Sequence, residues 1–466
     1  MGYRLIIAAS VVWFRHRQGA RVFAAVLTLA ACLTSFGPAR AGTMAGPAAP
    51  KAYVGLFSDN TVAVIDTGTN RVLTTIPIPA GPHGLAMSPD GRRVYASSDG
   101  ASTVSVISTV TDRAVSTVEV GKSPHGLAIT PDGRTVLVAV FGTSQVAFID
   151  TVRNEVVAKI PVGSPHNIAI TPDGREAYVA SQTPGAPALA VLDIAGRRQT
   201  AAVPLDKTPR ALSFSPDGAT LCFTLAGSDA VQVLDPRSNQ IVAQIPVGAS
   251  PHHPLFTPKG EYALVVSQGP GQLAVIDSRG RRLVSTVNVG KFPHWIATSS
   301  DGRIAYVTNE GANSVSVVDV DKGRVLETIP VGNAPRKIVM QPGPVGKTQS
   351  GNPTPIHATM AVHATAVPAA APRVSMAPSP ASGGPVQVRI ENFAFVPAPI
   401  KVTPSTTVVW SNADQIPHTS TSKDGIWDSK PIQPGATFKV TFDKPGTYSY
   451  GCTIHPFMQA TVVVGT

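Results

Sequence analysis

Cysteine is scarce in this chain, which has only three among its 466 residues. Three thiols cannot build the disulfide framework of a small secreted scaffold, so we expect no structural disulfide. Charged residues make up only 14% of the chain, and lysine and arginine do not gather into the basic runs that bind nucleic acids. The sequence therefore argues against a disulfide-stabilised fold and against a nucleic-acid partner.

Apolar stretches long enough to form a transmembrane helix, about 20 residues, are also missing. Residues 1–41 instead combine five arginines, no acidic residue, a short apolar run at 22–33 and a small-residue cleavage site before Gly42. This order is typical of an export signal peptide. The residues that lead to Cys32 also resemble a lipoprotein signal, which leaves a lipid anchor at Cys32 as an alternative. In both cases we expect a periplasmic or otherwise exported protein.

Glycine and proline, in contrast, are abundant, with 41 and 43 residues. Many of them belong to a repeat that runs through residues 51–343, in which Pro-His or Pro-Arg precedes an apolar strand and Pro-Asp-Gly usually follows it. The second residue of the pair recurs seven times at intervals of 41 to 44 residues, at His83, His125, His166, Arg210, His252, His294 and Arg336.

Each repeat predicts four short strands, because segments such as 103–107 alternate in the strand period and Pro-Asp-Gly supplies a tight turn. Four strands per unit of about 42 residues are typical of a β-propeller. The repeat begins with three strands and ends with one inner strand, so the two ends complete a seventh blade and close the ring. The units resemble YVTN-type repeats, since residues 305–309 read Ala-Tyr-Val-Thr-Asn.

The repeated His or Arg precedes every inner strand, so all seven side chains are expected at one mouth of the central channel. Two interpretations stay open. The imidazoles of His83, His125, His166, His252 and His294 cap their strands by bonding backbone carbonyls, or they form a metal or anion site, because imidazole is a common metal ligand and arginine favours anions. The following segment, 344–385, is rich in proline, alanine and serine and predicts a disordered linker.

A second kind of motif lies at the end of the chain. Cys452, His455 and Met458 follow one another at Cys-x2-His-x2-Met spacing after a predicted strand, and His418 lies upstream. Two imidazoles, one thiolate and one weak axial thioether are the ligand set of a blue-copper electron-transfer site. The sequence therefore predicts one type 1 copper ion on these four side chains.

Residues 386–466 resemble a cupredoxin through this loop and through the stretch from Val408 to His418, with amicyanin, pseudoazurin and plastocyanin as relatives. The resemblance implies an all-β fold in which a seven-bladed propeller is followed by a cupredoxin β-sandwich. It also implies that His418, Cys452, His455 and Met458 bind copper and that Asn412 braces the thiolate loop.

These motifs favour an exported electron carrier over an enzyme, with the propeller as a docking or scaffold module and an unidentified redox protein as partner. Two alternatives remain. A copper oxidoreductase would hold a second metal in the propeller hub, a layout that resembles nitrous-oxide reductase, although a single cysteine cannot supply that family's binuclear copper site. A copper-binding or carrier protein would need no redox partner.

Overall fold

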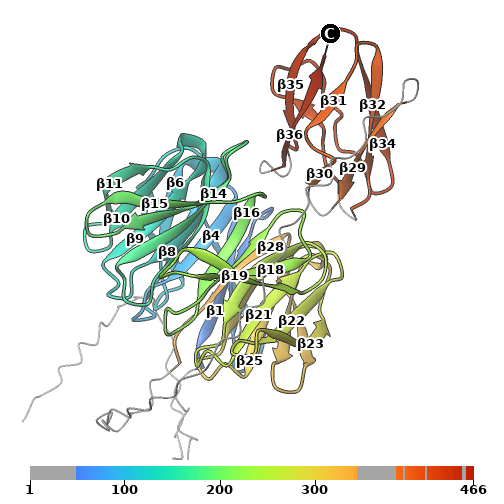
Figure 1. Ribbon diagram of the computed structural model, residues 1–466. Helices are drawn as coiled ribbons and strands as arrows, with labels where there is room; N and C mark the ends of the chain where they lie inside the picture. Colours follow the sequence, from blue (N-terminus) through green and yellow to red (C-terminus); the bar gives the residue numbers. More distant parts are fainter. Residues whose placement is uncertain (1–48, 344–384, 392–393, 415–416, 454–457, 466) are drawn as a thin grey trace, which may run out of the picture. The chain divides into compact units, whose positions relative to one another are not determined.

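A computed structural model describes residues 49–343, 385–391, 394–414, 417–453 and 458–465 (Figure 1). The predicted signal peptide at 1–41 with Cys32, the predicted linker up to residue 384, and His455 lie outside these residues. Apart from three short 3-10 helices, the described elements are β-strands. The 3-10 helices are Asp99–Ala101 (η1), Phe141–Thr143 (η2) and Glu310–Ala312 (η3). The described residues contain no helix with the length and apolar character needed to cross a membrane.

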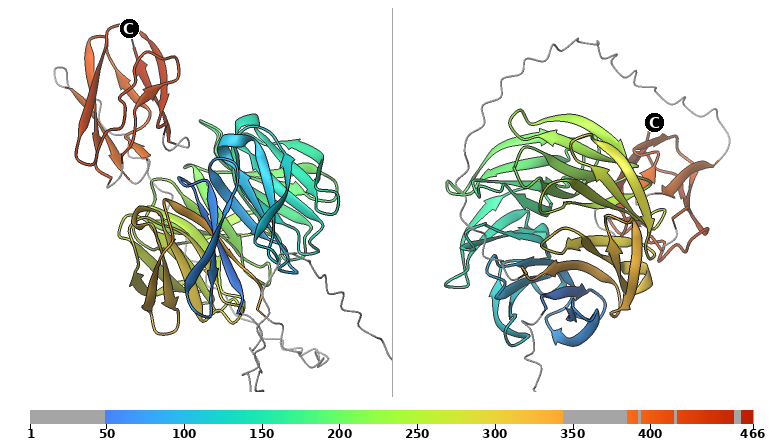
Figure 2. Two further views of the ribbon diagram at one scale, coloured as in Figure 1. Left: turned by 180° about the vertical axis from the view of Figure 1, so that it is seen from behind. Right: turned by 90° about the horizontal axis from the view of Figure 1, so that it is seen from below.

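Strands β1 to β28 form seven antiparallel four-stranded sheets, which are the blades of a β-propeller (Figure 2). The innermost strands are Pro82–Met87 (β4), Pro124–Ile129 (β8), Pro165–Ile170 (β12), Pro209–Phe214 (β16), Pro251–Phe256 (β20), Pro293–Thr298 (β24) and Pro335–Met340 (β28). Each innermost strand contacts those of both neighbouring blades, and β28 contacts β4, so the ring is closed.

The other three strands of each blade follow outward in chain order. The second strands are Lys51–Leu56 (β1), Arg93–Ser98 (β5), Thr135–Val140 (β9), Glu176–Ser181 (β13), Leu221–Leu225 (β17), Tyr262–Ser267 (β21) and Ile304–Asn309 (β25). The third strands are Thr61–Asp66 (β2), Thr103–Ser108 (β6), Gln145–Asp150 (β10), Ala188–Asp193 (β14), Ala230–Asp235 (β18), Gln272–Asp277 (β22) and Ser314–Asp319 (β26). The outermost strands are Arg71–Pro77 (β3), Arg113–Glu119 (β7), Glu155–Pro161 (β11), Arg198–Pro204 (β15), Gln240–Pro246 (β19), Arg282–Asn288 (β23) and Arg324–Pro330 (β27).

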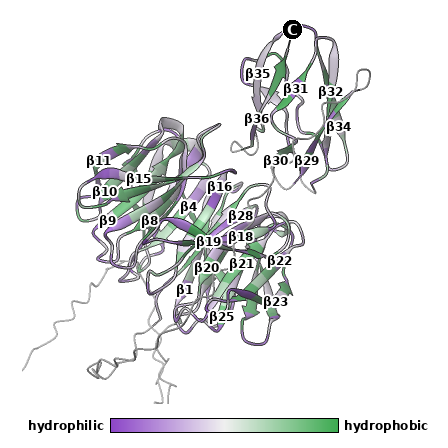
Figure 3. Ribbon diagram, in the orientation of Figure 1, coloured by the Kyte–Doolittle hydropathy of each residue, from purple (hydrophilic) through white to green (hydrophobic). Residues whose placement is uncertain are grey.

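Closure of the ring joins the two ends of the repeat region. Strand β28 pairs antiparallel with β1, with Ala52 opposite Met340 and Val54 opposite Ile338. The prediction of a seventh blade built from both ends is therefore confirmed. Hydrophobic residues concentrate on the strands (Figure 3), and they pack between adjacent blades rather than in one central core.

The predicted turns also form. At the end of β4, Gly91 adopts a φ of 68°, a conformation that side chains disfavour, and the Asp90 carboxylate accepts hydrogen bonds from the Ser88 hydroxyl and the Arg92 amide.

The C-terminal residues form a β-sandwich of two four-stranded sheets. One sheet has the order β30-β29-β32-β34, with Ala394–Val396 (β30), Val386–Glu391 (β29), Thr406–Asn412 (β32) and Thr437–Phe442 (β34). The other has the order β31-β36-β35-β33, with Ile400–Val402 (β31), Gln459–Val464 (β36), Gly446–Gly451 (β35) and Thr421–Ser422 (β33). Trp410 is fully buried between the sheets, and its ring lies 5.3 Å from that of Tyr450 and 5.9 Å from that of Trp427.

Candidate metal centres

Cys452 directly follows β35, as the sequence predicts. Its amide donates a hydrogen bond to the Met458 carbonyl at 3.0 Å, which returns the chain to β36. Gly451 permits this closure, because a side chain there would begin 2.8 Å from the Met458 carbonyl oxygen. The Cys452 and Met458 side chains are buried at the same end of the sandwich core, each residue only 2% exposed.

His418 reaches this thiol from the segment between β32 and β33. Its backbone forms an isolated antiparallel bridge with Ile432, which fixes the position of the imidazole. The side chain is fully buried, and its Nδ1 atom lies 3.8 Å from Cys452 Sγ. The structure therefore brings together His418, Cys452 and the Met458 segment, whereas the fourth predicted ligand, His455, is outside the described residues.

Backbone groups around the thiol complete its surroundings. The Thr419 amide lies 3.3 Å from Cys452 Sγ and donates to it. The Thr453 amide in turn donates to Thr419 Oγ1 at 2.8 Å, which ties the two loops together. A thiolate that accepts an amide hydrogen bond is stabilised relative to the thiol.

Asn412 was expected to brace the thiolate loop. Its buried amide nitrogen donates to the Ile432 carbonyl at 2.8 Å, and its oxygen accepts from the Asp414 amide at 3.0 Å. These contacts fix the segment that carries His418, because Ile432 is the backbone partner of His418. Through these two bonds Asn412 braces the segment that carries His418, and its bracing of the thiolate loop stays a prediction.

Asp414 is a residue that the sequence analysis missed. Its Oδ2 atom accepts a hydrogen bond from His418 Nε2 at 2.9 Å. Burial lowers the pKa of His418, but hydrogen bonds to Asp414 and Cys452 outweigh burial and raise it. Because Asp414 holds the proton on Nε2, the neutral ring offers Nδ1 to the thiol side. The signal was available, since Asp414 lies four residues before His418 in the same motif.

The donors fit a copper ion. Metal bonds to imidazole nitrogen and thiolate sulfur measure about 2.0 and 2.3 Å for zinc, so two such ligands of one ion lie within about 4.3 Å of each other. The observed 3.8 Å between Nδ1 and Sγ meets that limit. Sulfur donors with an imidazole in a dry pocket suit copper better than magnesium or calcium, which prefer oxygen ligands.

The repeated hub residues divide into two groups. His83, His125 and His166 form one cluster, in which one ligand atom from each ring lies within 4.8 Å of the others. The His83 and His125 rings are stacked with centroids 4.4 Å apart, and the His166 ring meets both edge-on. We refer to these three side chains as the histidine triad.

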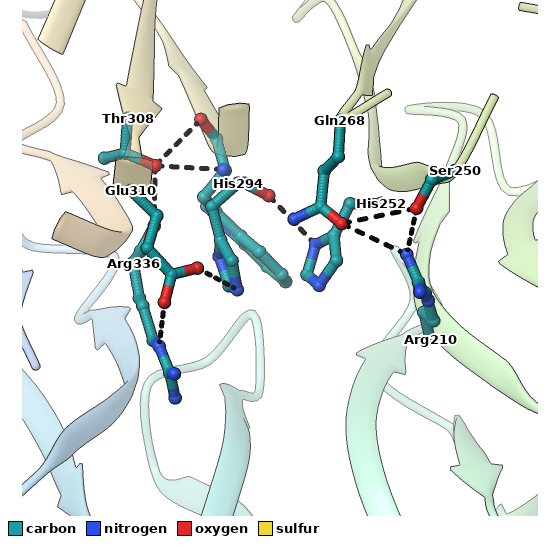
Figure 4. Close-up of polar contacts among 9 residues, drawn as sticks. Arg210, Ser250, His252, Gln268, His294, Thr308, Glu310 and Arg336 are labelled. Atoms are coloured by element: carbon teal, nitrogen blue, oxygen red, sulfur yellow. Dashed lines mark hydrogen bonds and ion pairs between the residues drawn. The ribbon is translucent and has the colours of Figure 1, made fainter. Parts of the chain in front are cut away.

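His252 and His294 form a separate pair, with ring centroids 4.0 Å apart. Glu310 lies between His294 and Arg336 in Figure 4, 3.0 Å from the Arg336 Nε atom and 3.8 Å from the imidazole. Arg210 donates to Ser250 and Gln268 (Figure 4). Both arginines of the ring therefore have protein partners, which weakens the interpretation of the hub as an anion site.

Lys337, one position after Arg336, is another missed residue. It is buried, its Nζ atom donates to Asn167 Oδ1 at 2.8 Å, and it lies 4.0 Å from the centroid of the Trp295 ring. Burial lowers the pKa of this lysine to about 7. Aligning the repeats would have revealed it, because none of the other six blades has a lysine or arginine at the equivalent position. Those positions hold Gly84, Gly126, Asn167, Ala211, His253 and Trp295.

Comparison with known proteins agrees with both halves of this description. Residues 358–464 match the model of the cupredoxin-like domain, and residues 50–132 match that of the YNCE-like beta-propeller. The chain is 34% identical over 112 residues to amicyanin-alpha of Methylorubrum extorquens, which covers 23% of this chain and 92% of that protein. It is 31% identical over 84 residues to the amicyanin of Paracoccus versutus, covering 17% of this chain and 64% of that protein.

Two solved structures share the fold. Hydrazine synthase of Kuenenia stuttgartiensis superposes with a TM-score of 0.55 at 23% identity, over 57% of this chain and 91% of that chain. A functionally unknown protein from Desulfotomaculum acetoxidans DSM 771 gives a TM-score of 0.54 at 15% identity, over 63% and 99%. At these identities the likeness shows the fold alone.

Proposed function

Because the chain belongs to the cupredoxin family through its C-terminal domain, we propose that it is an exported electron-transfer protein with one type 1 copper ion. The ligands in this proposal are His418, Cys452, His455 and Met458. The propeller serves as a docking or scaffold module, and the electron passes to or from a separate redox protein. The export signal that the sequence predicts at residues 1–41 supports a periplasmic location.

One observation carries the proposal: a buried cysteine sulfur and a buried imidazole nitrogen lie 3.8 Å apart in a domain that resembles amicyanins. A structural histidine would be satisfied by ordinary hydrogen bonds, and a structural cysteine by apolar neighbours. Their direct approach, with Asp414 on the far side of the ring, is the arrangement of two ligands and an orienting carboxylate.

The copper ion would supply a one-electron couple between Cu(I) and Cu(II). The chain's own residues hold the donors in place before the metal arrives. Burial keeps water away from Cys452 and Met458, Thr419 donates to the sulfur, and Asn412 fixes the loop that carries His418. A rigid, dry set of ligands changes little between oxidation states, which favours fast electron exchange.

A cysteine exchange tests the site. In the full chain loaded with Cu(II), Cys452→Ser should abolish the intense blue absorption, because that absorption requires a copper–thiolate bond. The matched control is Cys222→Ser, which changes the other buried cysteine, in the propeller. The control should stay blue. A blue Cys452→Ser protein would refute the assignment of the thiolate ligand.

A second candidate, a copper oxidoreductase with metal in the propeller, is favoured by the histidine triad. A non-redox copper carrier remains a third. If the blue copper is reduced and reoxidised without loss of metal, the protein is an electron carrier and not a non-redox copper carrier. Absorbance and copper content measure this.

A further inference from the structure

We propose that His83, His125 and His166 bind a second copper ion in the hub of the propeller. The three rings come from the innermost strands of consecutive blades, β4, β8 and β12. One nitrogen of each lies within 4.8 Å of the other two, and small ring rotations must close these separations to the about 4.0 Å that two metal–nitrogen bonds of about 2.0 Å allow. The residues are only 5 to 8% exposed. Three imidazoles are a known protein ligand set for a metal ion with an open position.

Two rings of the triad have a polar neighbour at one nitrogen. His166 Nδ1 lies 3.1 Å from the Arg210 carbonyl oxygen and 2.9 Å from the Asn167 amide nitrogen, and in the tautomer that donates to the carbonyl, Nε2 carries the lone pair. His125 Nε2 lies 3.4 Å from an Asp99 carboxylate oxygen, which places the proton on that atom. A backbone carbonyl or carboxylate on the remote nitrogen is the usual support of a metal-bound histidine.

Two other nitrogens lack any such support. His83 Nδ1 and His125 Nδ1 are buried and have no hydrogen-bond partner among the described residues. Burying a polar nitrogen without a partner costs free energy, so native proteins rarely leave one unsatisfied. Strand capping explains His252, whose Nδ1 bonds to the His294 carbonyl at 3.0 Å, but it explains neither these two atoms nor His294 Nδ1, which is also buried without a partner. In the triad a metal ion would satisfy both nitrogens, because a third imidazole lies beside them.

The sequence explains why the triad forms on this side of the ring. Glycine follows the histidine in two of its blades, as Gly84 and Gly126. A side chain at either position would collide with the backbone of the next inner strand, at His125 and His166 respectively. These glycines let β4, β8 and β12 approach closely enough for the rings to touch. Elsewhere in the ring larger residues, such as His253 and Trp295, occupy the same position.

Charge and chemistry select the metal. Imidazole suits copper, and copper is bound most tightly of the divalent first-row ions. A largely buried site suits the singly charged Cu(I) ion better than a divalent ion, because a higher charge costs more to remove from water.

Copper content of the full chain tests the proposal. After loading with Cu(I), chelator dialysis and reoxidation, the unaltered protein should hold two copper ions per chain. The double variant His83→Asn/His125→Asn should hold one and keep its full blue absorption, because the cysteine site is unchanged. The matched control, His252→Asn/His294→Asn, changes the equivalent repeat positions in the separate histidine pair. It should hold two copper ions per chain.

The blue absorption reports the C-terminal site separately, so loss of colour would count against the proposed function and not against the triad. Equal copper contents in the unaltered protein and the triad variant would overturn the proposal. So would retention of Zn(II) but not of copper. If the triad variant does not fold, crystals of the unaltered protein decide: anomalous density at the copper edge between the three rings supports the site, and its absence there refutes it.

Discussion

At the scale of single residues, both proposed centres depend on polar partners at the ring nitrogens. Asp414 accepts a hydrogen bond from His418 Nε2, and the Arg210 carbonyl lies 3.1 Å from His166 Nδ1. The ligand types were visible in the sequence, and Asp414 was within reach in the motif of His418, but the Arg210 carbonyl, which comes from another blade, was not. Orientation depends on side chains from other blades and loops, whose approach only the folded chain defines.

The Asn412 amide gives the first residue-scale prediction. Asn412→Ala removes two hydrogen bonds and leaves the buried Ile432 carbonyl without that donor, so the unfolding free energy of the copper domain should fall by about 1–3 kcal/mol. Loss of blue colour in a urea titration measures it. Gln387→Ala, which removes an exposed amide from the same sheet, should change stability by less than about 0.5 kcal/mol. Equal effects would show that Asn412 has no bracing role.

Buried histidines outside the triad give the second prediction. Burial first, and then nearby charges, hold the pKa values of His252, His253 and His294 well below 6.5 in the folded chain. Below pH of about 6.5 the unfolded chain takes up protons that the folded chain refuses. Below pH of about 6.5 the free energy of unfolding should therefore fall as pH drops, by at most about 1.4 kcal/mol per pH unit for each histidine. Above that pH these histidines should not make the unfolding free energy depend on pH.

The charged groups that face these rings change the size of this pH dependence of stability, but not its sign. Arg210, Arg336 and Lys337 oppose protonation, while Glu310, 3.8 Å from His294, partly favours it. Calorimetry at pH 7.5 and 5.5 should show the propeller transition at a lower temperature in acid, and His253→Gln should reduce that shift. A propeller transition with the same midpoint at both pH values would contradict the expectation.

At the scale of elements, the repeat made most of the fold predictable. The strand expected at 103–107 is Thr103–Ser108, and a strand does end directly before Cys452, at Gly451. The one-residue error arises because a strand ends where its partner's hydrogen bonds end, which is a property of the pair. The split of the hub into a triad and a pair was not predictable from an even ring of repeats.

Closure of the ring gives the element-scale prediction. Ile338 on β28 lies opposite Val54 on β1, and both are buried in one hydrophobic cluster. Ile338→Ala should destabilise the propeller by about 2–5 kcal/mol, because it leaves a cavity at the seam. Leu326→Ala, on the exposed face of β27, is the control and should cost much less. Calorimetry measures both, and a similar small effect of each would show that the seam adds little stability.

At the scale of the whole molecule, the C-terminal sandwich has a hydrophobic core between its own two sheets, centred on Trp410. A fragment of residues 386–466 should therefore fold alone and turn blue with Cu(II). The same fragment with Cys452→Ser should fold and stay colourless. Circular dichroism and visible absorbance decide, and an unfolded fragment would mean that the copper site needs the propeller.

The seam between β1 and β28 also constrains how the protein can be made. Ala52 and Met340 pair although nearly the whole propeller sequence separates them. At about 5–20 residues per second, a ribosome needs on the order of 15–60 s to supply the intervening chain. During that interval the nascent β1 exposes an unpaired edge, which is prone to aggregation. Biogenesis of this protein therefore requires that its first strand be kept from other chains until its last blade strand has been synthesised.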